Sequence, residues 1–433
     1  AGVMKVVQLI PGTGGTFYCQ NCMRDGALMR ALRGRGVDVT LVPMYLPLTV
    51  DAEGLEKHAP VFFGGINVYL QQKFRLFRKT PRWFDRLFDS RWMLKQAAAR
   101  EGSTSAATLG PMTLSMLQGR LGNQRKEIDR LTEWLQGHEK PDLIHASNSL
   151  LLGVATELKR ALKVPLVCTL QDEHTWLDVI PEPHGTQCWK TMSERGREVD
   201  AFIAVSDWYA GVMAGRMGIP RDRLAVAPVG IEFGDMEPVP APVEPPAIGY
   251  LSRMSESLGL GTLVDAFIEL KEAGTIPNLK LRVTGGHTAE DARFLERVQS
   301  ALRRRNLQDD VEFIEQFDRA SRHAFLRSLS VVSVPVPGGE AFGTFMIEAL
   351  ACGVPVVQPA EGAFPEIIEK TGGGILYDPS APNGLKNALE TLLRDRTRAH
   401  ELGRRGREAV LAQYSVEKTM ENVLAVYKSL VTS

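Results

Sequence analysis

The feature that most constrains the fold is a strand–loop–helix–strand unit at residues 329–358. An apolar run, Leu329–Val336, has the length and composition of a buried strand and leads into a turn rich in Pro and Gly. A short apolar helix from about Gly343 to Ala351 and a second strand at Val354–Gln358 complete the unit. Because backbone N–H groups are unpaired at the start of a helix, this loop is suited to bind a phosphate group.

Two carboxylates mark this unit. Glu340 lies in the loop, and Glu348 lies within the otherwise apolar helix. A buried ionised carboxylate is costly unless another group donates a hydrogen bond to it. Either a ribose diol or a nearby Arg would satisfy Glu348. The pattern therefore leaves two interpretations open, a nucleotide site and a structural ion pair.

The two carboxylates and their surroundings resemble the family-4 retaining glycosyltransferases, which have the GT-B fold. The similarity lies in the Glu-x7-Glu spacing and in the stretch Phe342–Val357. It implies that Glu340 contacts the donor sugar and that Glu348 binds the nucleotide ribose. It also implies that loop amides hold the sugar hydroxyls and the diphosphate. The donor-binding loop residues would be Phe342, Gly343 and Thr344.

The start of the chain has the pattern of a Rossmann-like domain. A strand at Lys5–Ile10, a Gly-rich turn, a helix from about residue 22 to 34 and a strand at Gly36–Pro43 follow one another. Gly14 and Gly15 in the turn allow a backbone to approach a phosphate or sugar closely, although a tight turn without a ligand is the alternative. The family resemblance places them beside the donor.

We predict an α/β protein of GT-B type, with two Rossmann-like doubly wound domains facing a central cleft. Residues 1–235 would form an acceptor-side domain with a helical insertion at about 60–140. A Pro-rich linker at 236–246 would lead to a nucleotide-sugar-binding domain at 247–412. The resemblance implies that a C-terminal helix, at 413–433, crosses back to the N-terminal domain.

The second domain begins with Ala247–Arg253, which resembles the family's strand that ends in an Arg. Arg253 is therefore expected to hold the donor diphosphate. The Lys that usually follows is replaced by Leu258, which removes one of two cations expected there. Leu279–Gly286 resembles another family strand with a glycine end and places Gly285 on the donor side.

Polar residues follow the strands of the first domain, where the ligand crevice of a parallel sheet lies. The catalytic candidates are therefore His145 and Asp172, in addition to Glu340 and Arg253. A hydrogen-bonded structural role is the alternative for a lone His. Gln171 stands where some relatives have a His, so the role of that His does not transfer to this chain.

Composition restricts the partners. Lys plus Arg and Asp plus Glu number 51 each, so net charge indicates no nucleic-acid partner. No apolar stretch is long enough to span a membrane. Five cysteines form no even disulfide framework and favour a reducing cytoplasmic location. The pair Cys19 and Cys22 is compatible with a redox or metal site, or with two packed thiols.

Residues 69–100 combine basic and aromatic side chains. This composition suits peripheral contact with an anionic membrane face or with a lipid-linked acceptor. An ordinary helical subdomain that buries its aromatic residues is the alternative.

Together these patterns predict a retaining, metal-independent glycosyltransferase of the hexosyltransferase type. It would move a sugar from a UDP or GDP sugar to a hydroxyl of a glycan, a lipid-linked molecule or a small molecule. No cofactor is expected beyond the donor, and the chain has no Asp-x-Asp pair. A nucleotide-sugar epimerase and a nucleotide-sugar-binding protein with little catalysis are the alternatives.

Overall fold

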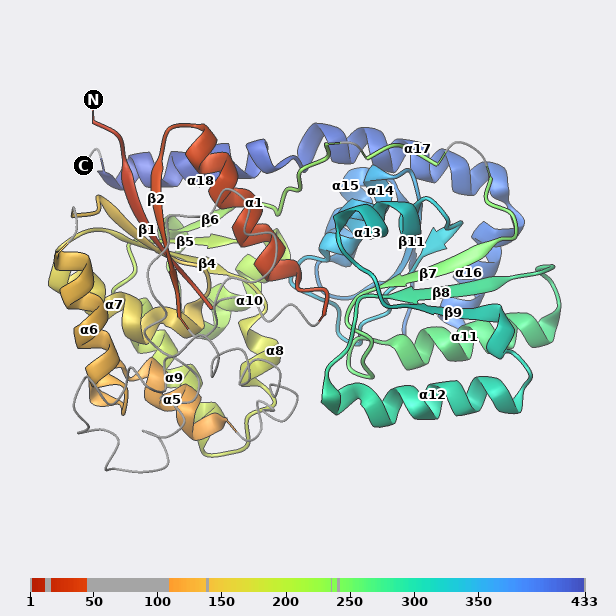
Figure 1. The fold of residues 1–433 in the computed structure, drawn as a ribbon, viewed down its shortest axis with the longest axis horizontal. Helices are drawn as coiled ribbons and strands as arrows, with labels where there is room; N and C mark the ends of the chain where they lie inside the picture. Colours follow the sequence, from red (N-terminus) through yellow and green to blue (C-terminus); the bar gives the residue numbers. More distant parts are fainter. Residues whose placement is uncertain are drawn as a thin grey trace. The chain divides into compact units, whose positions relative to one another are not determined.

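The structure is a computed structural model that describes residues 2–11, 17–44, 109–137, 140–234, 236–239 and 242–431. It divides into two compact units, each built on a parallel six-stranded sheet in the described part of the chain (Figure 1). The first unit comprises Ala1–Gly14, Asn21–Pro228 and Thr419–Ser433; the second comprises Gly15–Gln20 and Val229–Lys418. The two parallel sheets confirm the predicted pair of Rossmann-like domains.

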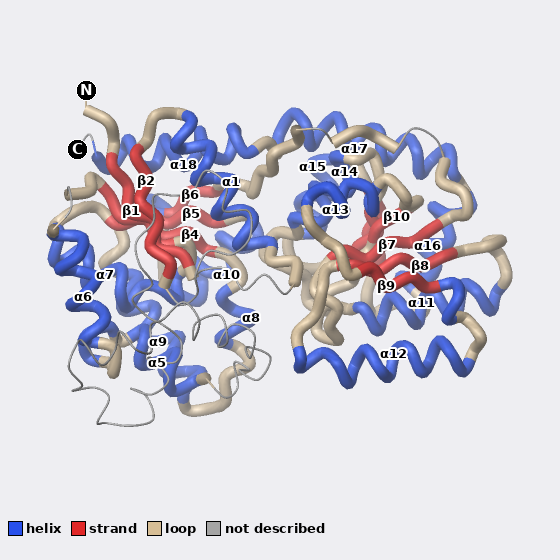
Figure 2. Tube along the Cα trace, in the orientation of Figure 1, coloured by secondary structure: helices blue, strands red, loops and turns tan. Residues whose placement is uncertain are grey.

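The first unit has the strand order β2-β1-β3-β4-β5-β6, and every neighbouring pair is parallel. The strands are β1 (Lys5–Ile10), β2 (Asp38–Pro43), β3 (Leu143–Ala146), β4 (Leu166–Leu170), β5 (Ala201–Ala204) and β6 (Leu224–Val226). In its described residues the α-helices are α1 (Gln20–Gly34), α5 (Gly110–Leu117), α6 (Arg125–Gln136), α7 (Leu152–Leu162), α8 (Glu173–Leu177), α9 (His184–Gly196) and α10 (Asp207–Met217). Figure 2 shows the strands as a central layer with helices around it.

The last helix, α18 (Val416–Val431), contributes to the core of the first unit. Met420, Val423 and Tyr427 recur at helical spacing and are buried among β1, α1 and β2 residues such as Leu28 and Val39. The end of the chain is thus held by apolar burial in the unit that the beginning of the chain forms.

The second unit has the strand order β12-β11-β10-β7-β8-β9, again all parallel. The strands are β7 (Ala247–Leu251), β8 (Lys280–Thr284), β9 (Val311–Ile314), β10 (Val331–Val332), β11 (Val356–Pro359) and β12 (Gly374–Tyr377). The α-helices are α11 (Leu260–Ala273), α12 (Ala292–Arg304), α13 (Arg319–Leu326), α14 (Thr344–Ala351), α15 (Phe364–Thr371), α16 (Gly384–Arg394) and α17 (Arg396–Gln413).

Counted from β7, this order is the doubly wound one, and it reverses between β7 and β10. Ligands of open parallel sheets bind outside the carboxyl ends of the strands at such a reversal. The topology therefore directs attention to the residues that follow Leu251 and Val332.

One predicted strand is shorter than expected. The apolar run 329–336 contributes only Val331–Val332 to the sheet as β10. Beyond it, the side chain of Gln358 takes over the backbone pairing: Val334 N donates to Gln358 Oε1 at 2.8 Å, and Gln358 Nε2 donates to Val334 O at 2.8 Å. Apolar composition predicted the burial of this run, whereas a distant side chain ends the ladder.

Several predicted features lie outside the described residues. They are Gly14, Gly15, the basic segment 69–100 and most of the insertion at 60–140. Of that insertion, the structure describes α5, α6 and the short connection between them. Within the described part of the chain, no helix has both the length and the hydropathy needed to cross a membrane.

Candidate functional site

The predicted donor loop lies at the reversal point of the second sheet. It connects β10 to α14, and Gly343 caps α14 at its N-terminus with a φ of 103°, a backbone conformation that favours glycine. At Gly339, also with positive φ, a Cβ atom would lie 2.5 Å from Gly362 N. Glycine at these positions lets the loop fold tightly and holds Glu340 and Thr344 at the start of the helix.

Glu348 lies on the second turn of α14, and only 3% of its surface is exposed. Arg322, on α13, donates from Nε to Glu348 Oε1 at 3.1 Å and from Nη1 to Phe317 O at 2.8 Å. The Tyr18 hydroxyl donates to Glu348 Oε2 at 2.6 Å. Burial and the neighbouring Glu348 raise the pKa of Tyr18, so its hydroxyl remains a donor.

These contacts show the ion pair that was one of the two interpretations of Glu348. The ion pair with Arg322 offsets the cost of burying the charge of Glu348. Each carboxylate oxygen can accept more than one hydrogen bond. The pair with Arg322 therefore leaves acceptor capacity on Glu348 for the hydroxyls of a diol.

Glu340 and Thr344 share a partner, the side-chain amide of Gln20. Gln20 Nε2 donates to Glu340 Oε2 at 3.2 Å, and Thr344 N donates to Gln20 Oε1 at 2.5 Å. Thr344 N–H belongs to the first turn of α14, where backbone N–H groups have no partner within the helix itself. The helix N-terminus and the loop carboxylate are thus close enough to bind the two ends of one small polar group.

Gly285 and Arg253 follow β8 and β7, at the same edge of the sheet. Gly285 O accepts from Tyr18 N at 2.7 Å, and Phe17 forms an antiparallel bridge with Gly286. The Arg253 guanidinium lies 5.6 Å from the centre of the Phe17 ring.

Arg253 also has a bidentate acidic partner. Its Nε and Nη2 atoms donate to the two oxygens of Asp291, at 2.9 and 3.0 Å. Burial acts to raise the pKa of Asp291, but hydrogen bonds from Arg253 and Thr288 outweigh it, so the pKa is lowered. Asp291 therefore neutralises the cation that we expected to face the donor diphosphate and fixes its orientation.

The structure thus brings together most of the predicted donor set. Arg253, Gly285, Glu340, Thr344 and Glu348 all contact the short segment Phe17–Gln20. Phe342 differs, because its buried ring packs against Tyr414 with the ring centres 6.0 Å apart.

Sequence reasoning missed four residues here: Tyr18, Gln20, Asp291 and Arg322. Their only signal was indirect, since a buried Glu requires a partner.

His145 occupies a different environment in the first unit. It lies on β3 with none of its surface exposed, and its ring nitrogens are 2.5 Å from Tyr427 Oη and 2.7 Å from Thr169 Oγ1. Burial, with a smaller effect of Arg24, lowers the pKa of His145 to about 3. A neutral, enclosed ring between two hydroxyls has a structural role, and we leave His145 out of the proposed machinery.

Asp172 is half-buried in the turn between β4 and α8, with a left-handed backbone (φ 64°). Its neighbour Glu173 is buried and accepts from Ser149 N at 2.9 Å, Gln171 N at 2.8 Å and Tyr209 Oη at 2.7 Å. Burial raises the pKa of Glu173. Glu173 therefore ties together the chain beyond β3 and β4, a role that the sequence did not indicate.

The cysteines divide into two groups. Cys19 and Cys22 are disulfide-bonded, whereas Cys168, Cys188 and Cys352 are free and buried. Among the alternatives for the Cys19 pair, the structure therefore shows a disulfide and not two packed thiols. In the described residues, no group of three or more His, Cys, Asp and Glu side chains could hold a metal ion.

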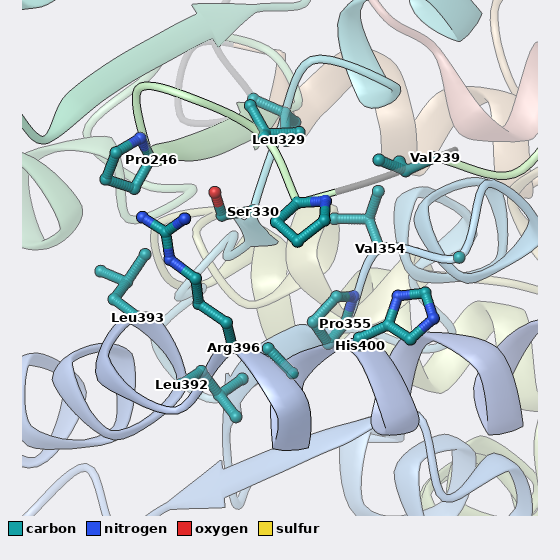
Figure 3. Close-up of a pocket in the computed structure, with 14 residues that line it drawn as sticks. Val239, Pro246, Leu329, Ser330, Val354, Pro355, Leu392, Leu393, Arg396 and His400 are labelled. Atoms are coloured by element: carbon teal, nitrogen blue, oxygen red, sulfur yellow. The ribbon is translucent and has the colours of Figure 1, made fainter.

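A small pocket of about 60 Å³ lies at the opposite edge of the second sheet (Figure 3). Pro246, Ser330 and Pro355 line it just before β7, β10 and β11 begin. Figure 3 shows Arg396 reaching from α17 toward Ser330 and Pro246, and Arg396 is paired with Glu244. None of the predicted site residues lines this pocket.

Comparison with known families identifies two adjoining matches. The model "Glycosyl transferases group 1" matches residues 234–409, and the model "Glycosyltransferase Family 4" matches residues 98–234.

Two curated relatives illustrate the sequence similarity. A D-inositol 3-phosphate glycosyltransferase from Segniliparus rotundus is 26% identical over 313 residues, covering 68% of this chain and 68% of that protein. A phosphatidyl-myo-inositol mannosyltransferase from Mycobacterium leprae is 28% identical over 211 residues, covering 48% of this chain and 54% of that protein. The chain thus spans about half to two thirds of the length of these relatives.

Solved structures match over nearly the whole chain. Sucrose-phosphate synthase from Thermosynechococcus elongatus has a TM-score of 0.72 at 18% identity, with 99% of both chains covered. The Anabaena protein HepE, in a complex with UDP and glucose, has a TM-score of 0.69 at 17% identity, with 99% of this chain and 100% of that chain covered. At these identities the likeness concerns the fold.

Proposed function

Because the chain belongs to the family-4 glycosyltransferases of GT-B fold, we propose that it transfers a hexose from a nucleoside diphosphate sugar to an acceptor hydroxyl with retention of anomeric configuration. The observation that carries this proposal is the pair of buried carboxylates, Glu340 and Glu348, around the N-terminus of α14 at the reversal point of the sheet. Acids in such a place suit the hydroxyl-rich parts of a nucleotide sugar.

Each residue has a proposed task. Glu340 accepts hydrogen bonds from the donor sugar, and Glu348, held by Arg322, accepts them from the ribose. Thr344 N–H and the dipole of α14 stabilise the negative charge that develops on the diphosphate, with Arg253 as the side-chain cation. Preorganised donors of this kind contribute most where charge appears in the transition state.

The proposed transfer needs no protein base. The bond between the anomeric carbon and the diphosphate oxygen breaks, and the acceptor oxygen forms the new bond to that carbon. The acceptor proton passes to the leaving phosphate, so mass and charge balance without a titrating side chain. This scheme agrees with the removal of His145 from the set, because its lowered pKa makes it a poor base.

We propose only the chemical class of the nucleotide and of the acceptor. A Mycobacterium tuberculosis relative is described as GDP-mannose-dependent, and HepE was solved with UDP-glucose. Both nucleotides are therefore the first candidates for this chain. The acceptor is a hydroxyl of a glycan, a lipid-linked molecule or a small molecule. Flotation with anionic liposomes tests the lipid-linked case through segment 69–100.

A donor screen tests the activity. The full chain is incubated with UDP and GDP sugars and a panel of hydroxyl acceptors, with and without EDTA, and release of the nucleoside diphosphate is measured. We expect turnover that survives EDTA and a product whose anomeric proton coupling matches that of the donor. Tight nucleotide binding without turnover would indicate a binding protein, and rearrangement of the donor sugar without an acceptor would indicate an epimerase.

A further inference from the structure

The segment Phe17–Gln20 belongs by its contacts to the second unit. Two backbone contacts anchor it at the carboxyl end of β8, from Tyr18 N to Gly285 O and from Phe17 to Gly286. Its side chains then reach the groups that the proposed donor needs. The segment therefore lies along the donor site and is held there independently of its side-chain hydrogen bonds.

The hydrogen bonds of Gln20 match those expected of a donor. Its amide offers an N–H to Glu340, as a sugar hydroxyl would, and an oxygen to Thr344 N–H, as a sugar or phosphate oxygen would. The donor and Gln20 seek the same two partners. Thr344 has one backbone N–H, so a second acceptor there must displace the first or share its hydrogen atom.

Tyr18 has the same relation to Glu348. Its hydroxyl donates to Oε2 at 2.6 Å, and the Arg322 guanidinium carbon lies 5.6 Å from the centre of its ring. Only 4% of Tyr18 and 3% of Glu348 is exposed. A ribose diol that reaches Glu348 must therefore move the tyrosine or share the carboxylate oxygen with it.

We propose that Tyr18 and Gln20 determine donor affinity in this chain by competing with the nucleotide sugar for Glu340, Thr344 and Glu348. The inference rests on the proposed function, because it takes these three residues as the donor site. A protein whose site is open for only a fraction of the time binds its ligand more weakly by that fraction. The side chains of Tyr18 and Gln20 set this fraction, and donor binding displaces them.

If the two side chains supported the donor and did not compete with it, the change in Kd would have the opposite sign. If Tyr18 and Gln20 stayed in place and added contacts to the donor, their removal would weaken nucleotide binding. If they served stability alone, their removal would lower the melting temperature and leave the affinity unchanged. The direction of the change in Kd therefore decides between competition and support.

The test is calorimetric titration of the full chain with UDP and with GDP. The proteins are wild type, Gln20→Ala, Tyr18→Phe and the double variant, with Gln308→Ala as control. Gln308 is an exposed glutamine at the opposite edge of the second sheet. We expect each single variant to bind the preferred nucleotide about two- to tenfold more tightly, the effect of removing one competing hydrogen bond. The control should bind like the wild type.

Unchanged or weaker binding by both single variants would overturn the inference while leaving the nucleotide site standing. Absence of UDP and GDP binding in every protein, the double variant included, would instead overturn the proposed function and this inference with it. Melting temperatures of all variants identify any that fail to fold.

A second variant guards against a misfolded Tyr18→Phe. Gln20→Met keeps the approximate size of the side chain but removes both the N–H group and the oxygen that Gln20 uses, so it should also tighten nucleotide binding.

Discussion

The two units share a sheet architecture but differ in the chemistry at the carboxyl ends of their strands. In the second unit this edge holds paired charges, Glu348 with Arg322 and Arg253 with Asp291. In the first unit the corresponding edge also holds one buried pair, Arg24 with Asp25, beside Ser147. Its other buried polar groups are a neutral histidine, His145, and Glu173, which accepts from two backbone N–H groups and a tyrosine. A shared topology therefore gathers polar groups at the same edge of both sheets, whereas the side chains determine the chemistry of each edge.

The difference has a physical reason. Stabilising a leaving diphosphate requires fixed positive charge and free N–H groups, and a buried charge must be paired to be stable. The pairs of the second unit provide both a cation and its fixed orientation. In the first unit, the buried Glu173 instead connects the chain beyond β3 to the chain beyond β4.

The largest expected effect is on stability in the second unit. Arg322→Ala removes the ion-pair partner of the buried Glu348, and breaking a buried pair on one side costs about 3–5 kcal/mol of unfolding free energy. Denaturant titration followed by circular dichroism measures it. The exposed neighbour Arg327→Ala should cost less than about 0.5 kcal/mol. Equal losses in both variants would show that the pair has no special weight.

The next effect concerns turnover. Glu340→Gln removes the charge that we assign to the donor sugar while keeping its shape, and kcat should fall about 10²-fold or more. Glu369→Gln, on the exposed side of α15, should retain wild-type kcat. Full activity of Glu340→Gln would remove this residue from the mechanism.

The third prediction concerns pH and the first unit. The pKa of His145, about 3, lies below the usual value of 6.5, so the unfolded chain binds a proton where the folded chain does not. Stability from this residue is present above pH 6.5 and is lost as the pH falls toward 3.

Between pH 7 and pH 5 we therefore expect wild type to lose about 2 kcal/mol more unfolding free energy than His145→Gln does. Urea titrations at the two pH values measure the difference. Parallel pH dependences would show that His145 does not remain neutral in the folded unit. In either case His145→Gln should retain far more turnover at pH 7 than Glu340→Gln.

The smallest effect is on donor affinity through Arg253. Arg253→Gln removes a cation already paired with Asp291, so the Kd for the nucleoside diphosphate should rise only about three- to tenfold. Arg297→Gln, at an exposed position of α12, is the matched control. An unchanged Kd would assign Arg253 to the fold and leave the diphosphate to the helix N-terminus.

The sequence predicted the positions of the candidate residues better in the second unit than in the first. The spacing of Glu340 and Glu348 predicted one acid in the loop and one buried acid on the short helix, and the structure places Glu340 before α14 and Glu348 on it. For His145 the strand and its end were predicted, but β3 is buried along its whole length, so no alternation of polar and apolar residues showed where the side chain points.

The chain's own residues determined the alternation of strands and helices, the tight glycine loop and the need of Glu348 for a partner, because all of these depend on neighbours close in sequence. Only the tertiary structure identified the partners of Glu348. Tyr18 lies 330 residues away from Glu348 along the sequence and Arg322 lies 26 away. Contacts over such separations arise from packing around the whole sheet, and no local pattern encodes them.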